Sequence, residues 1–258
     1  AHALHGDLYS LTGQTEQAIE KYKRTLELNQ ANYLVWEQLL INLADLKRLD
    51  ELVKYSADAI DLFPNQGMLF YMNGLALVES QEYNEAIEAL EQAVIMSGKN
   101  EDLKFNTYGL LGKAYRKSGK TEKAIQIYDK ALLIHPDDAG ILNDYSYHLA
   151  LNTDRLDEAQ VLLAKAIKSN PNDPEFLATQ SLIHYRHQNL DKAKESIERS
   201  IKNGGDRYGY ILEKYGDILF KLDQSEKALK QWKQAQIMGG ASKLLERKIA
   251  EGKLIETQ

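Results

Sequence analysis

The chain has 258 residues, enough for one or two ordinary domains, and its 43% hydrophobic and 27% charged residues are typical of a folded protein and exclude a disordered one. A formal net charge of −6 would repel a phosphate backbone, so we expect no nucleic-acid partner. The absence of cysteine excludes disulfides, thiol catalysis and cysteine zinc sites.

Nothing in the chain indicates a membrane-spanning helix. No apolar run approaches the roughly 18 to 20 residues that such a helix needs. The first ten residues also lack the basic start and apolar centre of a signal peptide. We therefore expect no direct insertion into a membrane.

A small or aliphatic residue recurs along the chain at intervals of 34 to 38 residues, as a set of seven anchors. The anchors are Ala18, Leu52, Ala86, Ala124, Ala159, Ala193 and Ala228. Seven positions after each anchor stands a second small residue, as in Ala131 and Ala235, except for Thr25 in the first copy. Such spacing lets two helices approach closely, which is a packing requirement that no catalytic mechanism would repeat seven times.

Each copy predicts two antiparallel helices, because apolar residues fall at helical spacing on both sides of a short polar break. In chain order the pairs are expected at residues 1–32, 33–66, 67–100, 105–138, 139–173, 174–207 and 209–240, as one array over residues 1–258. Gly13 and Gly119 suit the left-handed position that ends a first helix. Prolines at 64, 136 and 171 stand where a second helix must stop.

Local departures from the period predict irregularities. Residues 101–104 insert four residues before the fourth copy, and Thr153–Arg155 are expected to lengthen the turn of the fifth by one. The first copy begins inside its first helix, so we expect the rest of that helix, and further repeats, upstream.

The last segment, residues 241–252, predicts one helix that caps the final pair. Its expected apolar face consists of Leu244, Leu245, the aliphatic stem of Lys248 and Ile249. We expect this cap to cover Leu229, Trp232 and Ile237.

The pattern of W or L, LG, Y, A, F or Y, A and P over 34 residues resembles the tetratricopeptide repeat, as in YGLLGKAYRKSGKTEKAIQIYDKA from Tyr108 to Ala131. The resemblance covers residues 1 to about 240. It implies an all-α fold, a right-handed α-solenoid of about seven helix pairs plus a C-terminal capping helix. The segments LNDYSYHLA, GDILFKL and SKLLERKI are similar in sequence to tetratricopeptide arrays of bacterial cell-envelope proteins. This similarity favours a periplasmic or envelope-associated location over a cytoplasmic one.

In this family the first helix of each repeat lines a concave face, so the resemblance implies a protein- or peptide-binding scaffold. The candidate peptide-binding residues carried over by register are Tyr71, Met72, Leu75, Asn106, Leu110, Lys113, Arg116, Asn143, Tyr147, Leu182, Tyr185 and Arg186. Their chemistry favours an extended or helical peptide with apolar anchors and a few acidic residues. The alternative for any one of them is packing between neighbouring first helices.

Patterns that would indicate chemistry are weak. His184 and His187 could share a helix face, with His148 in the neighbouring repeat, but zinc needs three or four ligands that converge. The sequence shows no nucleophile elbow and no glycine-rich phosphate loop. We predict no catalysis, no cofactor and no metal site. A structural spacer within a larger multidomain protein stays open as the alternative to a binding scaffold.

Overall fold

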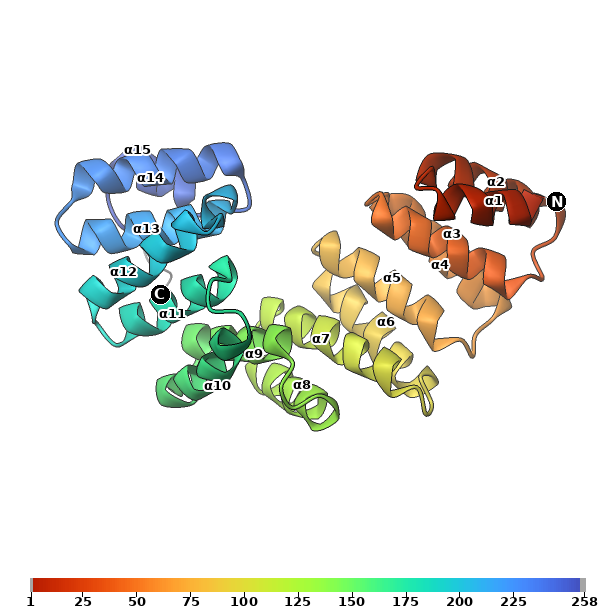
Figure 1. Cartoon of the computed structure of the whole chain (residues 1–258), viewed down its shortest axis with the longest axis horizontal. Helices are drawn as coiled ribbons and strands as arrows, with labels where there is room; N and C mark the ends of the chain where they lie inside the picture. Colours follow the sequence, from red (N-terminus) through yellow and green to blue (C-terminus); the bar gives the residue numbers. More distant parts are fainter. Residues whose placement is uncertain (1, 256–258) are drawn as a thin grey trace. The chain divides into compact units, whose positions relative to one another are not determined.

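The structure is a computed structural model that describes residues 2–255, and all regular elements in that range are helical (Figure 1). The all-α fold that the sequence predicts is therefore confirmed. Close backbone contacts divide the chain into two compact units, one ending at Pro136 and one beginning at Asp137.

Unit 1 is a stack of helix pairs. Its elements are α1 (His2–Leu11), α2 (Thr15–Leu28), α3 (Tyr33–Asp45), α4 (Leu49–Leu62), α5 (Gly67–Glu79), α6 (Tyr83–Met96), α7 (Glu101–Lys117) and α8 (Thr121–Ile134). Each odd-numbered helix packs on the even-numbered helix that follows it. The even-numbered helices α2, α4 and α6 in turn pack on the first helix of the next pair.

Unit 2 repeats this arrangement and ends in a short helix. Its elements are α9 (Ala139–Asn152), α10 (Leu156–Ser169), α11 (Pro174–Arg186), α12 (Leu190–Lys202), the 3-10 turn η1 (Gly205–Arg207), α13 (Gly209–Lys221), α14 (Ser225–Met238) and α15 (Leu245–Glu251). First helices α9 and α11 contact each other directly.

Small residues at fixed spacing do bring the two helices of a pair together. The anchors Ala18, Ala124 and Ala228 are fully buried. A Cβ on Gly112 would stand 2.5 Å from the ring of Tyr128, so the bare glycine backbone receives the aromatic side chain of the opposite helix. In the second pair Leu40 holds this position, and α3 and α4 make the fewest close contacts of the seven pairs formed by α1 to α14.

Three-residue turns join the two helices of each pair, and most have a left-handed middle residue. Gly13 and Gly119 have φ of 74° and 75°, which confirms the predicted helix-ending role. The amide that follows each of them donates to the carbonyl five residues earlier, as Lys120 N does to Tyr115 O at 2.9 Å. Four other turns place a residue with a side chain there: Lys47, Gln81, Gln188 and Asp223.

The fifth pair differs from the prediction. Its turn, Thr153–Arg155, has the same three residues as the others, so the expectation of a longer turn is wrong. The extra residue lies in α9, which has 14 residues against 13 in α5 and α11. Asp154 has no left-handed φ, and this turn lacks the bond to the carbonyl five residues earlier.

The four residues at 101–104 belong to helix α7, which is 17 residues long. The link from α6 to α7 is as short as the links after α2 and α4. Asn100 begins the helix by accepting a hydrogen bond from Leu103 N at 3.0 Å. The insertion therefore adds a helical turn instead of lengthening a loop.

The C-terminal cap is α15, and it is held by charge as well as by apolar contact. Leu245 is buried against Trp232 and Leu212. Lys248 is 3% exposed, and its ammonium lies 2.7 Å from both Glu213 Oε1 and Asp217 Oδ1. Lys248 thus adds a buried charge to the stem that was expected on the apolar face. The expected cover of Ile237 is wrong, because this residue is 75% exposed.

Candidate peptide-binding face

The candidate residues of unit 1 lie on α5 and α7, which contact each other. Tyr71 and Leu75 are half-buried and pack against the core, and burial raises the pKa of Tyr71. Met72 belongs to the core with 8% exposure. Tyr71 and Leu75 therefore keep part of their apolar surface exposed on α5.

Helix α7 adds a polar and positively charged strip. Asn106 is exposed and Leu110 is half-buried. Lys113 forms a salt bridge with Glu79 at 3.1 Å, in which both partners are well exposed. Partial burial and the positive charges of Arg116 and Lys113 lower the pKa of Lys117. The end of α7 thus has a positive potential that favours an acidic group.

The candidate residues of unit 2 lie on α9 and α11. Asn143 and Leu182 are buried, whereas Tyr147 and Tyr185 are half-buried. Leu182 and Tyr185 line a small cavity of ≈ 20 Å³ between α11 and α13. The candidates thus form two sets, one in each unit, and each set lies on neighbouring first helices.

Arg186 has a structural role in unit 2. Its guanidinium donates to the backbone oxygens of Ala150 at 2.5 Å and Thr153 at 3.1 Å, and to Asp154 Oδ1 at 3.1 Å. These groups end α9 and form the turn that lacks a left-handed residue. Arg186 therefore caps the C-terminus of the neighbouring first helix, where a cation is also favoured by the helix dipole.

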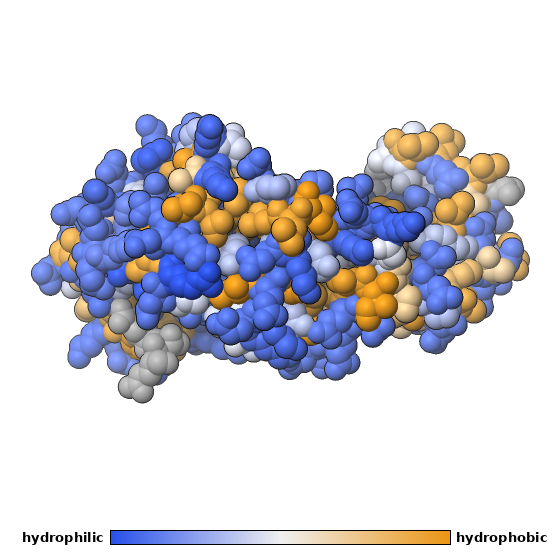
Figure 2. Space-filling model, turned by 90° about the horizontal axis from the view of Figure 1, so that it is seen from below, coloured by the Kyte–Doolittle hydropathy of each residue, from blue (hydrophilic) through white to orange (hydrophobic). Residues whose placement is uncertain are grey.

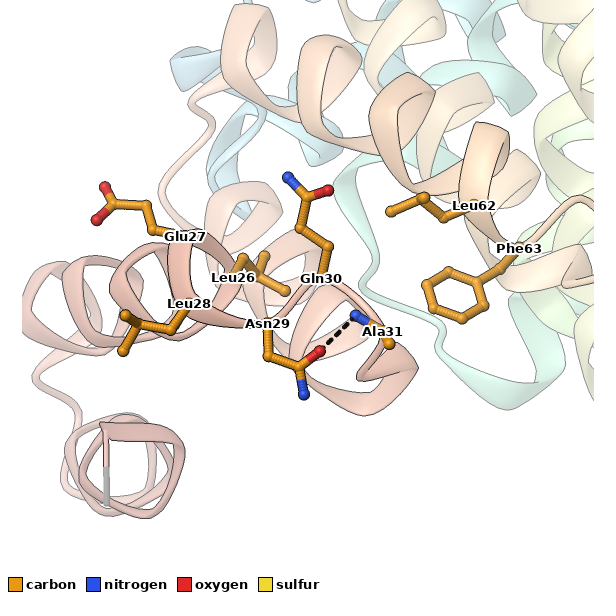
Figure 3. Close-up of a pocket in the computed structure, with 8 residues that line it drawn as sticks. All are labelled: Leu26, Glu27, Leu28, Asn29, Gln30, Ala31, Leu62 and Phe63. Carbon is orange, nitrogen blue, oxygen red and sulfur yellow. Dashed lines mark hydrogen bonds between the residues drawn. The ribbon is translucent and has the colours of Figure 1, made fainter.

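A pocket of ≈ 580 Å³ lies away from the candidate residues, at the ends of second helices α2 and α4 (Figure 3). Leu26, Leu62 and Phe63 line it, together with the loop after α2, in which Asn29 Oδ1 accepts a hydrogen bond from Ala31 N at 2.9 Å. Hydrophobic side chains also gather in separate patches on a mostly hydrophilic surface (Figure 2). The exposure of apolar side chains alone therefore does not identify the first helices as the binding surface.

Unit 2 contains a group of side chains that the sequence did not predict to lie together. We call it the tyrosine–carboxylate cluster, and its members are Asp144, Tyr147, Glu175, Tyr208 and Tyr210. Asp144 and Tyr147 belong to α9, and Glu175 is the second residue of α11. Tyr210 is the second residue of α13, directly after Tyr208 and Gly209. Glu175 and Tyr210 are each the second residue of the first helix in their repeat, the sixth and the seventh. Applying the groove positions of the family to that second residue would have found both.

The histidines do not converge. His148 is buried and its Nδ1 lies 3.1 Å from the amide of Asn152, whereas the ring of His187 lies 3.9 Å from Asp157. Over residues 2–255, no three His, Cys, Asp or Glu side chains are grouped so that they could hold a metal ion. In the same range, no helix combines the length and the apolar character needed to cross a membrane.

Models of the tetratricopeptide repeat match three parts of the chain, residues 1–32, 66–137 and 115–183. Together with the helix pairs, these matches show that the chain belongs to the tetratricopeptide repeat family. Its fold is accordingly the α-solenoid of that family, whose members act generally as protein-interaction scaffolds.

Known proteins agree with this assignment. The chain is 26% identical over 205 residues to TPR repeat-containing protein PA4667 of Pseudomonas aeruginosa, which corresponds to 78% of the chain and 34% of that protein. The chain thus spans about a third of the length of this bacterial relative.

Two solved structures show the same fold. A tetratricopeptide repeat protein from Parabacteroides merdae has a TM-score of 0.80 at 15% identity, with 97% of each chain covered. YrrB, described as a TPR protein with an unusual peptide-binding site, has a TM-score of 0.56 at 20% identity over 72% of this chain and 93% of its own.

Proposed function

We propose that the chain is a scaffold without catalysis that binds a protein or peptide on the exposed faces of its first helices. The observation that carries this proposal is the pair of contacting helices α5 and α7, of which α5 has half-buried Tyr71 and Leu75 and α7 has a group of basic residues. Aromatic and basic side chains of this kind concentrate binding energy in protein interfaces. The peptide-binding site named for YrrB supports the same type of ligand.

The ligand that fits unit 1 is a peptide with an apolar anchor for Tyr71 and an acidic residue for the end of α7. Partial burial lowers the pKa of Lys117, and the charges of Arg116 and Lys113 lower it further. An anion in the ligand would offset that repulsion, which supports the acidic residue. The net charge of −6 does not oppose such a ligand, since short-range charge acts at contact and distant charges are screened.

Selection of random peptides on the immobilised chain tests this function. We expect enriched peptides to contain an acidic residue, and Lys117→Glu to weaken their binding about tenfold or more, in line with measured couplings of interfacial charge pairs. Tyr71→Ala should weaken the same peptides. Lys99→Glu, on the exposed loop before α7, is the matched charge reversal and should leave binding unchanged.

Peptides that bind wild type, Lys117→Glu and Lys99→Glu equally would contradict the proposed face. A structural spacer within a larger protein is the second candidate. It is supported by the bacterial relative, because the match to this chain covers only 34% of that protein. A selection that enriches no peptide at all would favour the spacer.

We also propose a periplasmic or cell-envelope location, on the likeness of LNDYSYHLA and SKLLERKI to arrays of envelope proteins. Fractionation of the native cells with an antibody against the chain tests it. Recovery in the cytoplasmic fraction alone would contradict it.

A further inference from the structure

A further pocket of unit 1 lies between the second helices α6 and α8, and we call it the α6–α8 pocket. Its volume is ≈ 360 Å³, and its lining includes the buried residues Leu111, Tyr115 and Ile127. None of the candidate peptide-binding residues lines it. The α6–α8 pocket is therefore a second surface feature of unit 1, with a largely apolar floor.

An exposed aliphatic side chain also lines this pocket. Ile95 on α6 is 64% exposed, although it lies in the middle of the array and not at its end. Ile95 stands nine residues after the anchor Ala86, and packing within the array does not require an apolar side chain at that position. Four of the seven repeats have a charged residue there, namely Glu27, Asp61, Lys168 and Lys202. A partner that covers Ile95 would remove its apolar surface from water.

Two lysines of α8 give the pocket a positive charge. Lys123 and Lys130 line it and are exposed, and among residues 2–255 neither ammonium forms an ion pair with a carboxylate. The Lys123 ammonium stands 5.3 Å from the centre of the Tyr115 ring. Glu91, the one carboxylate of the lining, accepts a hydrogen bond from the Tyr115 hydroxyl. The lining thus has a surplus of positive charge, which favours an acidic partner.

The spacing of the two lysines indicates the form of that partner. Lys123 and Lys130 are seven residues apart, so they lie on one face of α8 and about 10 Å apart along its axis. A helix with acidic residues at i and i+7 has the same spacing, and its residue i+4 lies between them on the same face. Amphipathic helices bind in this way, with their apolar face in a groove between other helices.

We propose that the α6–α8 pocket binds an acidic amphipathic helix of a partner protein. An aliphatic residue of that helix packs against Ile95 and Ile127, and its carboxylates meet Lys123 and Lys130. The net charge of −6 does not oppose this contact, because distant charges are screened. The site is independent of the proposed face on α5 and α7, so a scaffold with both surfaces holds two partners at once.

The test is a titration of the full chain, ¹³C-labelled at its isoleucine methyl groups, with a synthetic alanine-based helix that has glutamate at i and i+7 and leucine at i+4. We expect saturable shifts of the Ile95 and Ile127 signals. The signal of Ile237, which is 75% exposed at the same repeat position in unit 2, should not move. Control helices with glutamine in place of both glutamates, or of the leucine, should bind about tenfold or more weakly.

Variants of the chain locate the contact. The double variant Lys123→Glu with Lys130→Glu should weaken binding about tenfold or more, because attraction becomes repulsion. Ile95→Asp should weaken it as well and should keep the fold, since Asp61 holds the same position in the second repeat. Ile237→Asp is the matched control and should leave the affinity unchanged.

Equal binding of the glutamine helices, no shift at Ile95, or unchanged affinity in Ile95→Asp would each overturn the proposal. Sedimentation of the free chain covers one more occupant: self-association that Ile95→Asp abolishes would assign the pocket to a second copy of the chain and overturn the proposal too. Lys117→Glu, which should weaken the peptides selected for α5 and α7, should leave helix binding unchanged. Failure of either surface is thus distinguishable from failure of the other.

Discussion

Four residues with side chains hold the left-handed conformation that the turns within the helix pairs require. Lys47, Gln81, Gln188 and Asp223 have φ between 52° and 64°. Such a conformation costs a residue with a Cβ roughly 1–2 kcal/mol relative to right-handed backbone. The hydrogen bonds that end the first helix, such as Glu82 N to Leu77 O at 2.8 Å, hold the chain in it.

Gln81→Gly should stabilise unit 1 by about 0.5–1 kcal/mol, because glycine removes the left-handed strain but adds entropy to the unfolded chain. Urea unfolding measures the change. The matched control is Glu82→Gly, whose φ of −88° carries no such strain, and it should destabilise the protein. Equal destabilisation by both substitutions would show that the turn is not strained at Gln81.

At the scale of the element, α9 ends differently from the other first helices. Its extra residue leaves the turn without a left-handed residue, and the carbonyls that the usual turn would satisfy face Arg186 of α11 instead. One irregular helix end is thus stabilised by a side chain from the next repeat.

Arg186→Met should destabilise unit 2 by about 1–3 kcal/mol, since it keeps the aliphatic stem but leaves carbonyls of α9 without a donor. Amide exchange at residues 150–155 should accelerate. Arg199→Met, an exposed arginine on α12, is the control. Unchanged exchange in Arg186→Met would mean that water satisfies the end of α9 equally well.

At the scale of the whole molecule, each of the two compact units contains one tryptophan. Trp36 belongs to the core of unit 1, and Trp232 is fully buried in unit 2, where its Nε1 donates to Asp217 Oδ1 at 3.0 Å. Each repeat of such an array is stabilised mainly by the repeats next to it. A substitution that destabilises one unit therefore does not have to destabilise the other.

Lys248→Met should destabilise unit 2 by about 3–5 kcal/mol, because Glu213 would stay buried without its counter-charge and Asp217 would keep only Lys214, at 3.5 Å. Fluorescence of Trp232 in a Trp36→Phe background should show the loss, and Trp36 in a Trp232→Phe background should show no change. Adding Glu213→Gln and Asp217→Asn should restore much of the stability. Lys243→Met is the exposed control, and an equal loss there would contradict the buried network.

The repeat, the helix pairs and several helix ends could be predicted from the sequence by itself. The glycines of the turns and the prolines after α4, α8 and α10 act through local sterics, which depend on the residue and its near neighbours in the chain. Anchors such as Ala124 could be recognised because they recur with the period of the repeat. The placement of residues 101–104 could not be predicted in the same way, because an insertion can extend either a loop or a helix.

Only the tertiary structure decided which side chains meet across repeats. Arg186 reaches α9, Lys248 reaches Glu213, and Glu175 approaches Tyr210, each over roughly one repeat length of sequence. It also showed that Met72, Asn143 and Leu182 are buried, whereas Tyr71 and Tyr147 keep part of their surface. Periodicity defines the face of a helix, but the depth of a residue on that face depends on how closely the next helix packs against it.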